Sequence, residues 1–129
     1  MASELRVDTL KDASGNNSVG MAYVAEGSGK AWANYSGSGT TFRDSFNCAS
    51  ATDNGTGDYT TTFTNAMNNG DYSFSAGIRL DSGANAAYSV RGIEFKTPAT
   101  GSIRFVCQVG TGSANDFDYT CPQIMGDLA

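Results

Sequence analysis

The chain has 129 residues, of which 16 are glycine and two are proline, and it is rich in Ser, Thr and Asn. This length suits one domain with a tail, and this composition favours a turn-rich β protein over a helical one. Because 13 acidic residues outnumber 8 basic ones, the net charge of −5 disfavours binding to a nucleic-acid backbone. No apolar run approaches the roughly 20 residues that cross a bilayer, so we expect no membrane insertion.

Residues 1–30 differ in composition from the rest of the chain. Leu5, Val7 and Leu10 form one short apolar patch, and a polar turn cluster follows at 12–18. So small an apolar inventory cannot fold alone. We therefore predict that residues 1–30 are a short extended arm that attaches to another chain or a larger assembly through Leu5, Val7 and Leu10. Residues 31–129 are then the β domain.

From residue 31 onward, short alternating runs follow one another at short intervals and are separated by turn signals. This pattern predicts an all-β sandwich or barrel, and of these we expect an antiparallel β-sandwich of the jelly-roll kind. In the run 41–48, Phe42, Phe46 and Cys48 share one mostly apolar face with Asp44. Two further runs alternate strictly, and their inward-facing residues are predicted to be Tyr72, Phe74, Ala76, Ile78 and Leu80, then Ile103, Phe105, Cys107 and Val109.

The stretch 50–63 predicts a β-hairpin. Its turn, 53–58, contains Asn54, Gly55 and Gly57, which tolerate positive φ, and an alternating Tyr and Thr run follows. Asp53 and Asp58 also allow an interpretation as part of a cation-binding loop. The terminal Glu and the following helix of a calcium-binding hand are missing here, so a turn between strands is the favoured interpretation.

Two positions predict local irregularities in the later strands. The apolar phase shifts between residues 87 and 96, so we predict a β-bulge at Gly92. Pro122 lies inside the expected last strand, 117–125, and cannot donate to a ladder. That strand is therefore expected to be an edge strand or to pair with its N–H side free.

The residues that carry common catalytic chemistry are scarce in this sequence. The chain has no histidine, no G-x-S-x-G elbow and no phosphate-binding loop, so we predict that it is not an enzyme and has no cofactor. A pair of carboxylates acting as acid and base stays open. Cys48, Cys107 and Cys121 lack zinc-site spacing and are interpreted as reduced apolar fillers, with a Cys107 to Cys121 disulfide as the alternative.

Recognition is expected in loops, because loops on a rigid sandwich commonly carry binding. The candidate recognition residues are Ser82 and Asn85 in one polar loop and Ser113 and Asn115 in another. An aromatic platform for sugars is a weaker alternative, since such rings are more often core or cross-strand packing. The aromatic residues concerned are Trp32, Tyr35, Tyr59, Tyr72, Tyr88 and Tyr119.

Four segments carry a resemblance to a known family. They read Ala-Trp-Ala-Asn-Tyr-Ser-Gly-Ser-Gly-Thr at 31–40, Arg-Asp-Ser-Phe-Asn at 43–47, Thr-Asp-Asn-Gly-Thr-Gly-Asp-Tyr-Thr at 52–60 and Phe-Thr-Asn-Ala-Met at 63–67. With the Leu-x-Val-Asp-Thr-Leu segment at 5–10 and Gly-Asp at 126–127, the chain resembles the C-terminal β domain of tail fibre proteins of marine bacteriophages. The likeness covers most of the chain and is looser at 86–115.

The resemblance implies a virion structural protein with a trimeric β domain at a fibre tip. Its implied partners are further copies of itself, other virion proteins through the arm, and a glycan or protein of the host surface. The implied location is the virion, on a tail fibre or the capsid exterior, after assembly in the host cytoplasm. A head fibre or decoration protein that binds the shell is the first alternative, since so short an arm leaves little room for a shaft. A carbohydrate-active enzyme is the second.

Overall fold

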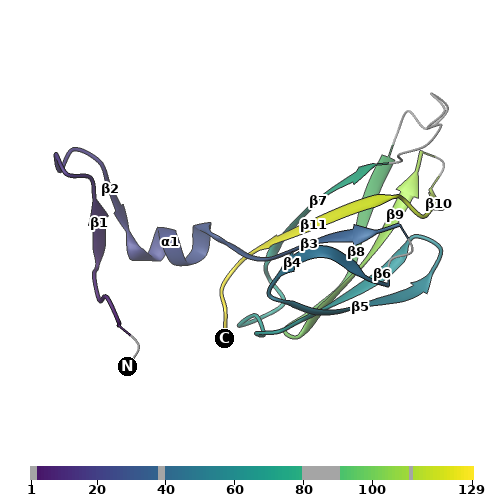
Figure 1. The fold of residues 1–129 in the computed structure, drawn as a ribbon, viewed down its shortest axis with the longest axis horizontal. Helices are drawn as coiled ribbons and strands as arrows, with labels where there is room; N and C mark the ends of the chain where they lie inside the picture. Colours follow the sequence, from purple (N-terminus) through teal and green to yellow (C-terminus); the bar gives the residue numbers. More distant parts are fainter. Residues whose placement is uncertain (1–2, 38–39, 80–90, 111) are drawn as a thin grey trace.

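The computed structural model describes residues 3–37, 40–79, 91–110 and 112–129 (Figure 1). An arm projects from one end of a β-sandwich. The arm is not extended throughout, because its polar cluster makes a tight turn with Gly15 at φ 72°. Its elements are strand β1 (Thr9–Lys11), strand β2 (Ser18–Gly20), antiparallel to β1, and helix α1 (Met21–Gly27).

The β domain consists of two antiparallel sheets, which confirms the predicted all-β sandwich. The first sheet has the order β4-β3-β11-β7, with β3 at Gly29–Ser36, β4 at Phe42–Phe46, β7 at Ser73–Arg79 and β11 at Tyr119–Met125. The second has the order β10-β9-β6-β5, and β8 also pairs with β9. Its strands are β5 (Cys48–Gly55), β6 (Asp58–Phe63), β8 (Arg91–Ala99), β9 (Ser102–Val109) and β10 (Ser113–Ala114).

The core lies between the two sheets and is rich in aromatic rings. Tyr35 of β3 packs edge-on against Phe105 of β9, with ring centroids 5.8 Å apart, and its hydroxyl lies 2.5 Å from the Thr61 hydroxyl. Tyr59 joins this group from β6, 5.5 Å from Tyr35. A second buried group, near the arm end of the sandwich, consists of Ala31, Phe63, Met67, Tyr72, Ile103 and Ile124.

The period-two patterns placed the core faces correctly. Along β7 the exposed residues alternate with half-buried ones, and Phe74, Ala76 and Ile78 face inward as predicted. On β9, Ile103, Phe105 and Cys107 are buried. Leu80 lies outside the described residues. The predicted hairpin 50–63 is confirmed as β5 and β6, with Gly55 and Gly57 at positive φ in its turn.

The predicted strand 41–48 is wrong as a single element. Asn47 breaks it, with φ of 54°, and the chain passes from β4 in one sheet to β5 in the other. The Asn47 side chain fixes this corner by accepting a 2.7 Å hydrogen bond from the Asn65 N–H and donating to the Lys30 carbonyl. As a result Phe46 points outward and is 53% exposed, whereas Cys48 packs against the core.

Of the two predicted irregularities, the bulge differs in position from the one observed, and Pro122 takes the second of its two predicted placements, with its N–H side unpaired. Gly92 pairs regularly with Gln108, and the register of β8 shifts instead between Phe95 and Thr97, so the predicted bulge is wrong in position. Pro122 is not on an edge strand, because β11 lies between β3 and β7. Pairing with β7 continues through Pro122, while pairing with β3 skips residues 121 and 122, so the missing donor faces an interrupted ladder.

Candidate functional site

The arm presents apolar side chains that no sheet of the domain covers. Leu5, Val7 and Leu10, the predicted attachment residues, are 79%, 36% and 41% exposed. The hairpin brings Leu10 opposite Val19, which sequence analysis did not select, and Tyr23 of α1 is 78% exposed. The signal for Val19 was its place in a second short strand beyond a turn. The arm therefore carries a larger apolar surface than the three predicted residues.

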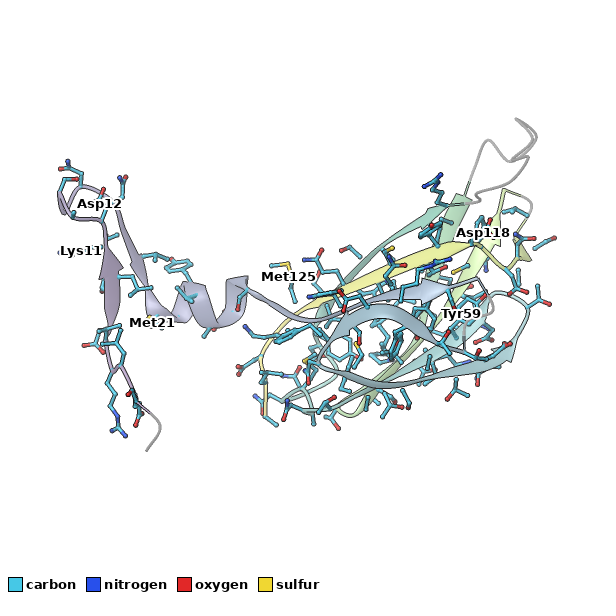
Figure 2. The ribbon with its side chains drawn as sticks, viewed as in Figure 1. Lys11, Asp12, Met21, Tyr59, Asp118 and Met125 are labelled. Atoms are coloured by element: carbon cyan, nitrogen blue, oxygen red, sulfur yellow. The ribbon has the colours of Figure 1, made fainter. Side chains whose placement is uncertain are left out.

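The hairpin of the arm is held by its own turn. Asp12 accepts a 2.7 Å hydrogen bond from the Asn17 side-chain amide, which holds the pKa of the Asp12 carboxyl below its usual value. The backbone N–H of Gly15 also donates to the Asp12 carbonyl, 3.0 Å away. Figure 2 shows Asp12 at the tip of the arm, away from the sandwich. Local polar contacts thus shape the arm without help from the domain.

One lysine joins the arm to the domain. The Lys30 ammonium donates to the Ala25 carbonyl at the end of α1 and to the Ser28 hydroxyl, which is 2.5 Å away. Lys30, the second residue of β3, is buried, with 8% of its surface exposed. A buried ammonium needs such acceptors, so these bonds fix how the chain leaves α1 and enters β3.

A polar loop that contains Ser113 and Asn115 lies at the opposite end of the sandwich from the arm, and we call it the distal loop. Ser113 is exposed on β10 and Asn115 is half-buried just after it, whereas the other two predicted recognition residues, Ser82 and Asn85, lie outside the described residues. The Asn115 N–H donates to the Cys107 carbonyl at 3.0 Å, which ties the loop to β9. Figure 2 shows Tyr59 and Asp118 at this end of the domain.

Asp116 anchors this loop to the turn of the β5–β6 hairpin. Its Oδ1 atom accepts hydrogen bonds from the Gly57 N–H at 2.6 Å and from the Tyr59 hydroxyl at 2.7 Å. Burial, together with the bond to Asp116, raises the pKa of the Tyr59 hydroxyl. At Gly57 a Cβ would stand 2.6 Å from the Cys107 carbonyl oxygen, so only glycine fits between β9 and the loop. The hairpin turn therefore holds the loop in place.

The carboxylates of the turn 53–58 have partners within the chain. Asp53 accepts the Gly55 N–H at 2.8 Å. Asp58 forms a two-point pair with Arg104, both contacts at 2.8 Å, and Lys96 approaches to 3.7 Å. Hydrogen bonds from Arg104 hold the pKa of the Asp58 carboxyl below its usual value. Among the described residues, no group of three His, Cys, Asp or Glu side chains is arranged to hold a metal ion.

A cation–π cluster lies on the first sheet, and sequence analysis missed it. The Arg43 guanidinium stands 3.9 Å from the centroid of the Tyr119 ring and donates to the carbonyls of Tyr35 and Asp118. Arg79 approaches the same ring to 5.3 Å. A shallow hollow of about 290 Å³ adjoins the cluster, lined by Gly77, Ile78, Arg79, Tyr119 and Cys121. The cluster joins residues from three strands, so no local sequence pattern predicts it.

The three cysteines are free in the structure, and the alternative Cys107 to Cys121 disulfide is not formed. Burial raises the pKa of the Cys48 and Cys107 thiols to about 11, and both pack as the predicted fillers. Cys121 is exposed instead, because it lies on the outward-facing side of β11. For Cys121 the filler interpretation is wrong.

Comparison of the chain with protein-family models, with curated proteins and with solved structures finds no match in any of the three. Among the residues described, no helix is long and apolar enough to cross a lipid bilayer.

Proposed function

We propose that the chain is a bacteriophage virion structural protein of the fibre-tip type. Residues 1–30 dock it to the virion, and a trimeric β domain adheres to the host surface. No covalent chemistry is involved, and three copies binding together give useful avidity even where each contact is weak. Two observations support this: the sequence resemblance, and the placement of the arm and the distal loop at opposite ends of the molecule.

The placement of the arm and the distal loop at opposite ends is the observation that carries the proposal. At one end, the arm exposes Leu5, Leu10 and Tyr23, and exposed apolar side chains gathered on a small segment mark an interaction surface. At the other end, Asp116 fixes a polar loop to the sandwich. A molecule with an attachment segment and a presented loop at opposite ends suits a protein that joins a particle to a surface.

Docking is tested by incorporation into virions. A chain with Leu10→Ser and Tyr23→Ser is supplied to an infection in which the native copy is deleted, and the protein in purified particles is quantified. We expect at least a tenfold loss of incorporation, because the substitutions remove apolar contact area. The matched control is Leu128→Ser, which changes a domain residue of similar exposure, 39% against 41% for Leu10. Full incorporation of the arm variant would contradict docking through the arm.

Adhesion is tested with the distal loop. The double change Ser113→Ala and Asn115→Ala is expected to weaken binding of the labelled protein to host cells. The control makes the same two chemical changes at Ser14 and Asn16, which lie in the exposed turn of the arm. Equal binding by both variants would remove the loop from the recognition surface.

Electron microscopy of particles with a gold-labelled copy decides the location. Label at a fibre tip supports the proposal, whereas label spread over the capsid supports the alternative of a head fibre or decoration protein. Incubation of purified protein with host polysaccharide addresses the enzyme alternative, because chain shortening would require a catalytic role.

A further inference from the structure

The guanidinium of Arg43 is held rigidly and still has donors to offer. Its Nη1 atom donates to the carbonyl oxygens of Tyr35, at 2.8 Å, and Asp118, at 2.6 Å, and its Cζ atom stacks 3.9 Å from the centroid of the Tyr119 ring. Among the described residues, no hydrogen bond or ion pair uses the Nε and Nη2 atoms of Arg43. Arg43 is exposed, so this edge of its guanidinium is a fixed two-point donor that faces solvent.

The surroundings of this donor edge are positive. Arg79 approaches the Tyr119 ring to 5.3 Å, although the chain has only 8 basic residues against 13 acidic ones. The two neighbouring carboxylates turn to other partners. Asp44 accepts the N–H of the next residue at 2.8 Å, and the Asp118 Oδ1 atom would stand 3.5 Å from a Cβ at Gly37. Two guanidinium groups gathered at one ring complement a negatively charged ligand.

Gly77 leaves open the hollow of about 290 Å³ beside these arginines. It is exposed within β7 and pairs with Cys121. Its φ is not positive, and a Cβ there would meet no atom within 4 Å. Neither backbone conformation nor crowding requires glycine at this position, although glycine weakens a strand. A glycine inside a strand often marks a place where a ligand comes close to the backbone.

An exposed aromatic ring extends this surface along the first sheet. Of the described candidates for a sugar-stacking platform, three are buried in the core, namely Tyr35, Tyr59 and Tyr72. The other two share the outer face of the first sheet: Trp32 is 40% exposed, and Tyr119 is half-buried. Trp32 pairs with Gln123, which lies four residues beyond Tyr119 on β11, so the two rings stand about 13 Å apart along the strand. Such rings stack on the C–H faces of sugars, and the Gln123 amide suits their hydroxyls.

We infer that this surface binds a saccharide that carries a carboxylate, such as a uronic acid within a host-surface glycan. The carboxylate accepts two hydrogen bonds from the Nε–Nη2 edge of Arg43, a geometry that arginine and carboxylate share. The sugar ring fills the hollow over Gly77, and further sugars extend toward Trp32. Figure 2 shows Asp118, which accepts from Arg43, at the end of the domain away from the arm. The inference rests on the proposed function for the host surface as the source of the glycan.

Calorimetric titration of the full chain tests the charge. The two probes are a triuronate and the same trisaccharide with its carboxyl groups reduced to alcohols, and we expect the triuronate to bind at least tenfold more tightly. Arg43→Lys keeps the positive charge but loses the planar fork. It is therefore expected to weaken triuronate binding at least tenfold. The control is Arg6→Lys, the same change on an exposed arginine of the arm.

Gly77→Val tests the hollow without removing any charge. The added side chain occupies space beside Tyr119, and its Cβ meets no neighbouring atom. We expect unchanged stability in urea unfolding, because valine favours a strand, together with at least a tenfold loss of affinity for the triuronate. Gly92→Val is the matched control, since Gly92 also lies in a strand with nothing within 4 Å of its Cβ.

Cys121 reports directly on occupation of the hollow that it lines. It is exposed, whereas Cys107 is buried, Cys48 is half-buried and both have pKa values of about 11. An alkylating reagent therefore meets Cys121 first. Saturating triuronate should slow its alkylation at least tenfold, and the reduced trisaccharide at the same concentration should not.

The outcomes separate this inference from the proposed function. Equal binding of the two trisaccharides, or binding of neither, overturns the inference, while docking through the arm and adhesion through the distal loop are measured on their own. Full affinity in Gly77→Val with unprotected Cys121 places the carboxylate elsewhere and overturns the site. An oligoglutamate peptide that binds as tightly as the triuronate overturns the saccharide as the ligand. Should Arg43→Lys fail to fold, Gly77→Val and the protection of Cys121 decide the question.

Discussion

The Tyr59 hydroxyl donates a 2.7 Å hydrogen bond to Asp116, which lies 57 residues further along the chain. The bond connects β6 of the hairpin to the loop that precedes β11. Tyr59 itself is 1% exposed, whereas Asp116 is exposed, so the bond reaches from the core to the rim of the domain. It is one of the contacts through which the core positions the distal loop.

Replacing Tyr59 by Phe removes this bond and leaves the ring in place. We expect a loss of about 1–2 kcal/mol in the free energy of unfolding, because a hydrogen bond to a carboxylate is stronger than a neutral one. Urea unfolding measures it. The control is Tyr23→Phe, the same chemical change on an exposed tyrosine of the arm, which should leave stability unchanged. Equal stability of the two variants would show that Asp116 does not depend on Tyr59.

Alkaline pH tests the buried phenols together. Burial raises the pKa of Tyr35, Tyr59 and Tyr72, so these groups stay neutral in the folded chain where they ionise in the unfolded one. The stability they confer is fully present below the ordinary tyrosine pKa of about 10 and is lost as pH rises above it. Thermal unfolding should therefore show a falling Tm above about pH 10. Titration of all six tyrosines near their ordinary pKa with the fold intact would contradict this.

Much of the fold could be predicted from the sequence, because side-chain alternation is local. The buried faces of β7 and β9 follow directly from this alternation, and Gly57 indicated the hairpin turn. The pairing of whole strands is not local. The sequence left two placements open for Pro122, an edge strand or a strand paired with its N–H side free, and strand pairing decides for the second, because the ladder with β3 is interrupted at residues 121 and 122. Asn47 ends β4 through bonds to residues 17 and 18 positions away, which no window of sequence contains.

The candidate site was predictable in outline. Leu5 and Leu10 stood out because apolar residues in a polar segment need a partner, and the loop with Ser113 stood out as polar and glycine-flanked. The groups that hold that loop were missed, since Asp116 acts on a turn far away in sequence.

Acid pH tests the pair of Asp58 with Arg104. Because Arg104 lowers the pKa of Asp58, the ionised carboxylate stabilises the folded chain above the ordinary pKa of about 4, and this contribution is lost as pH falls. Asp58→Asn should thus lower Tm at neutral pH, and the difference from the native protein should shrink below about pH 4. Asp71→Asn, which changes an exposed aspartate of the same domain, is the control. A difference in Tm that is constant with pH would mean that the charge of Asp58 does not stabilise the folded chain.

Two glycines with similar backbone conformations separate conformational strain from crowding. Gly57 and Gly112 have φ of 66° and 77°, so a Cβ costs each about 1–2 kcal/mol. At Gly112 nothing lies within 4 Å of that Cβ, whereas at Gly57 it would meet backbone atoms of Cys107 and Asn115 at 2.6–2.7 Å. We therefore expect Gly57→Ala to cost about 3–5 kcal/mol, since strand β9 or the loop must move. Gly112→Ala should cost only the backbone strain of about 1–2 kcal/mol.

Urea unfolding of both variants measures this difference, and host-cell binding adds a functional readout. If the hairpin turn holds the distal loop, Gly57→Ala should weaken binding by displacing Asn115, under conditions in which the variant is still folded. Gly112→Ala should then keep full binding despite its backbone strain, because Asp116 still bonds to Gly57 and Tyr59. Equal destabilisation of the two variants would show that the loop yields without cost, and the hairpin turn would not be its anchor.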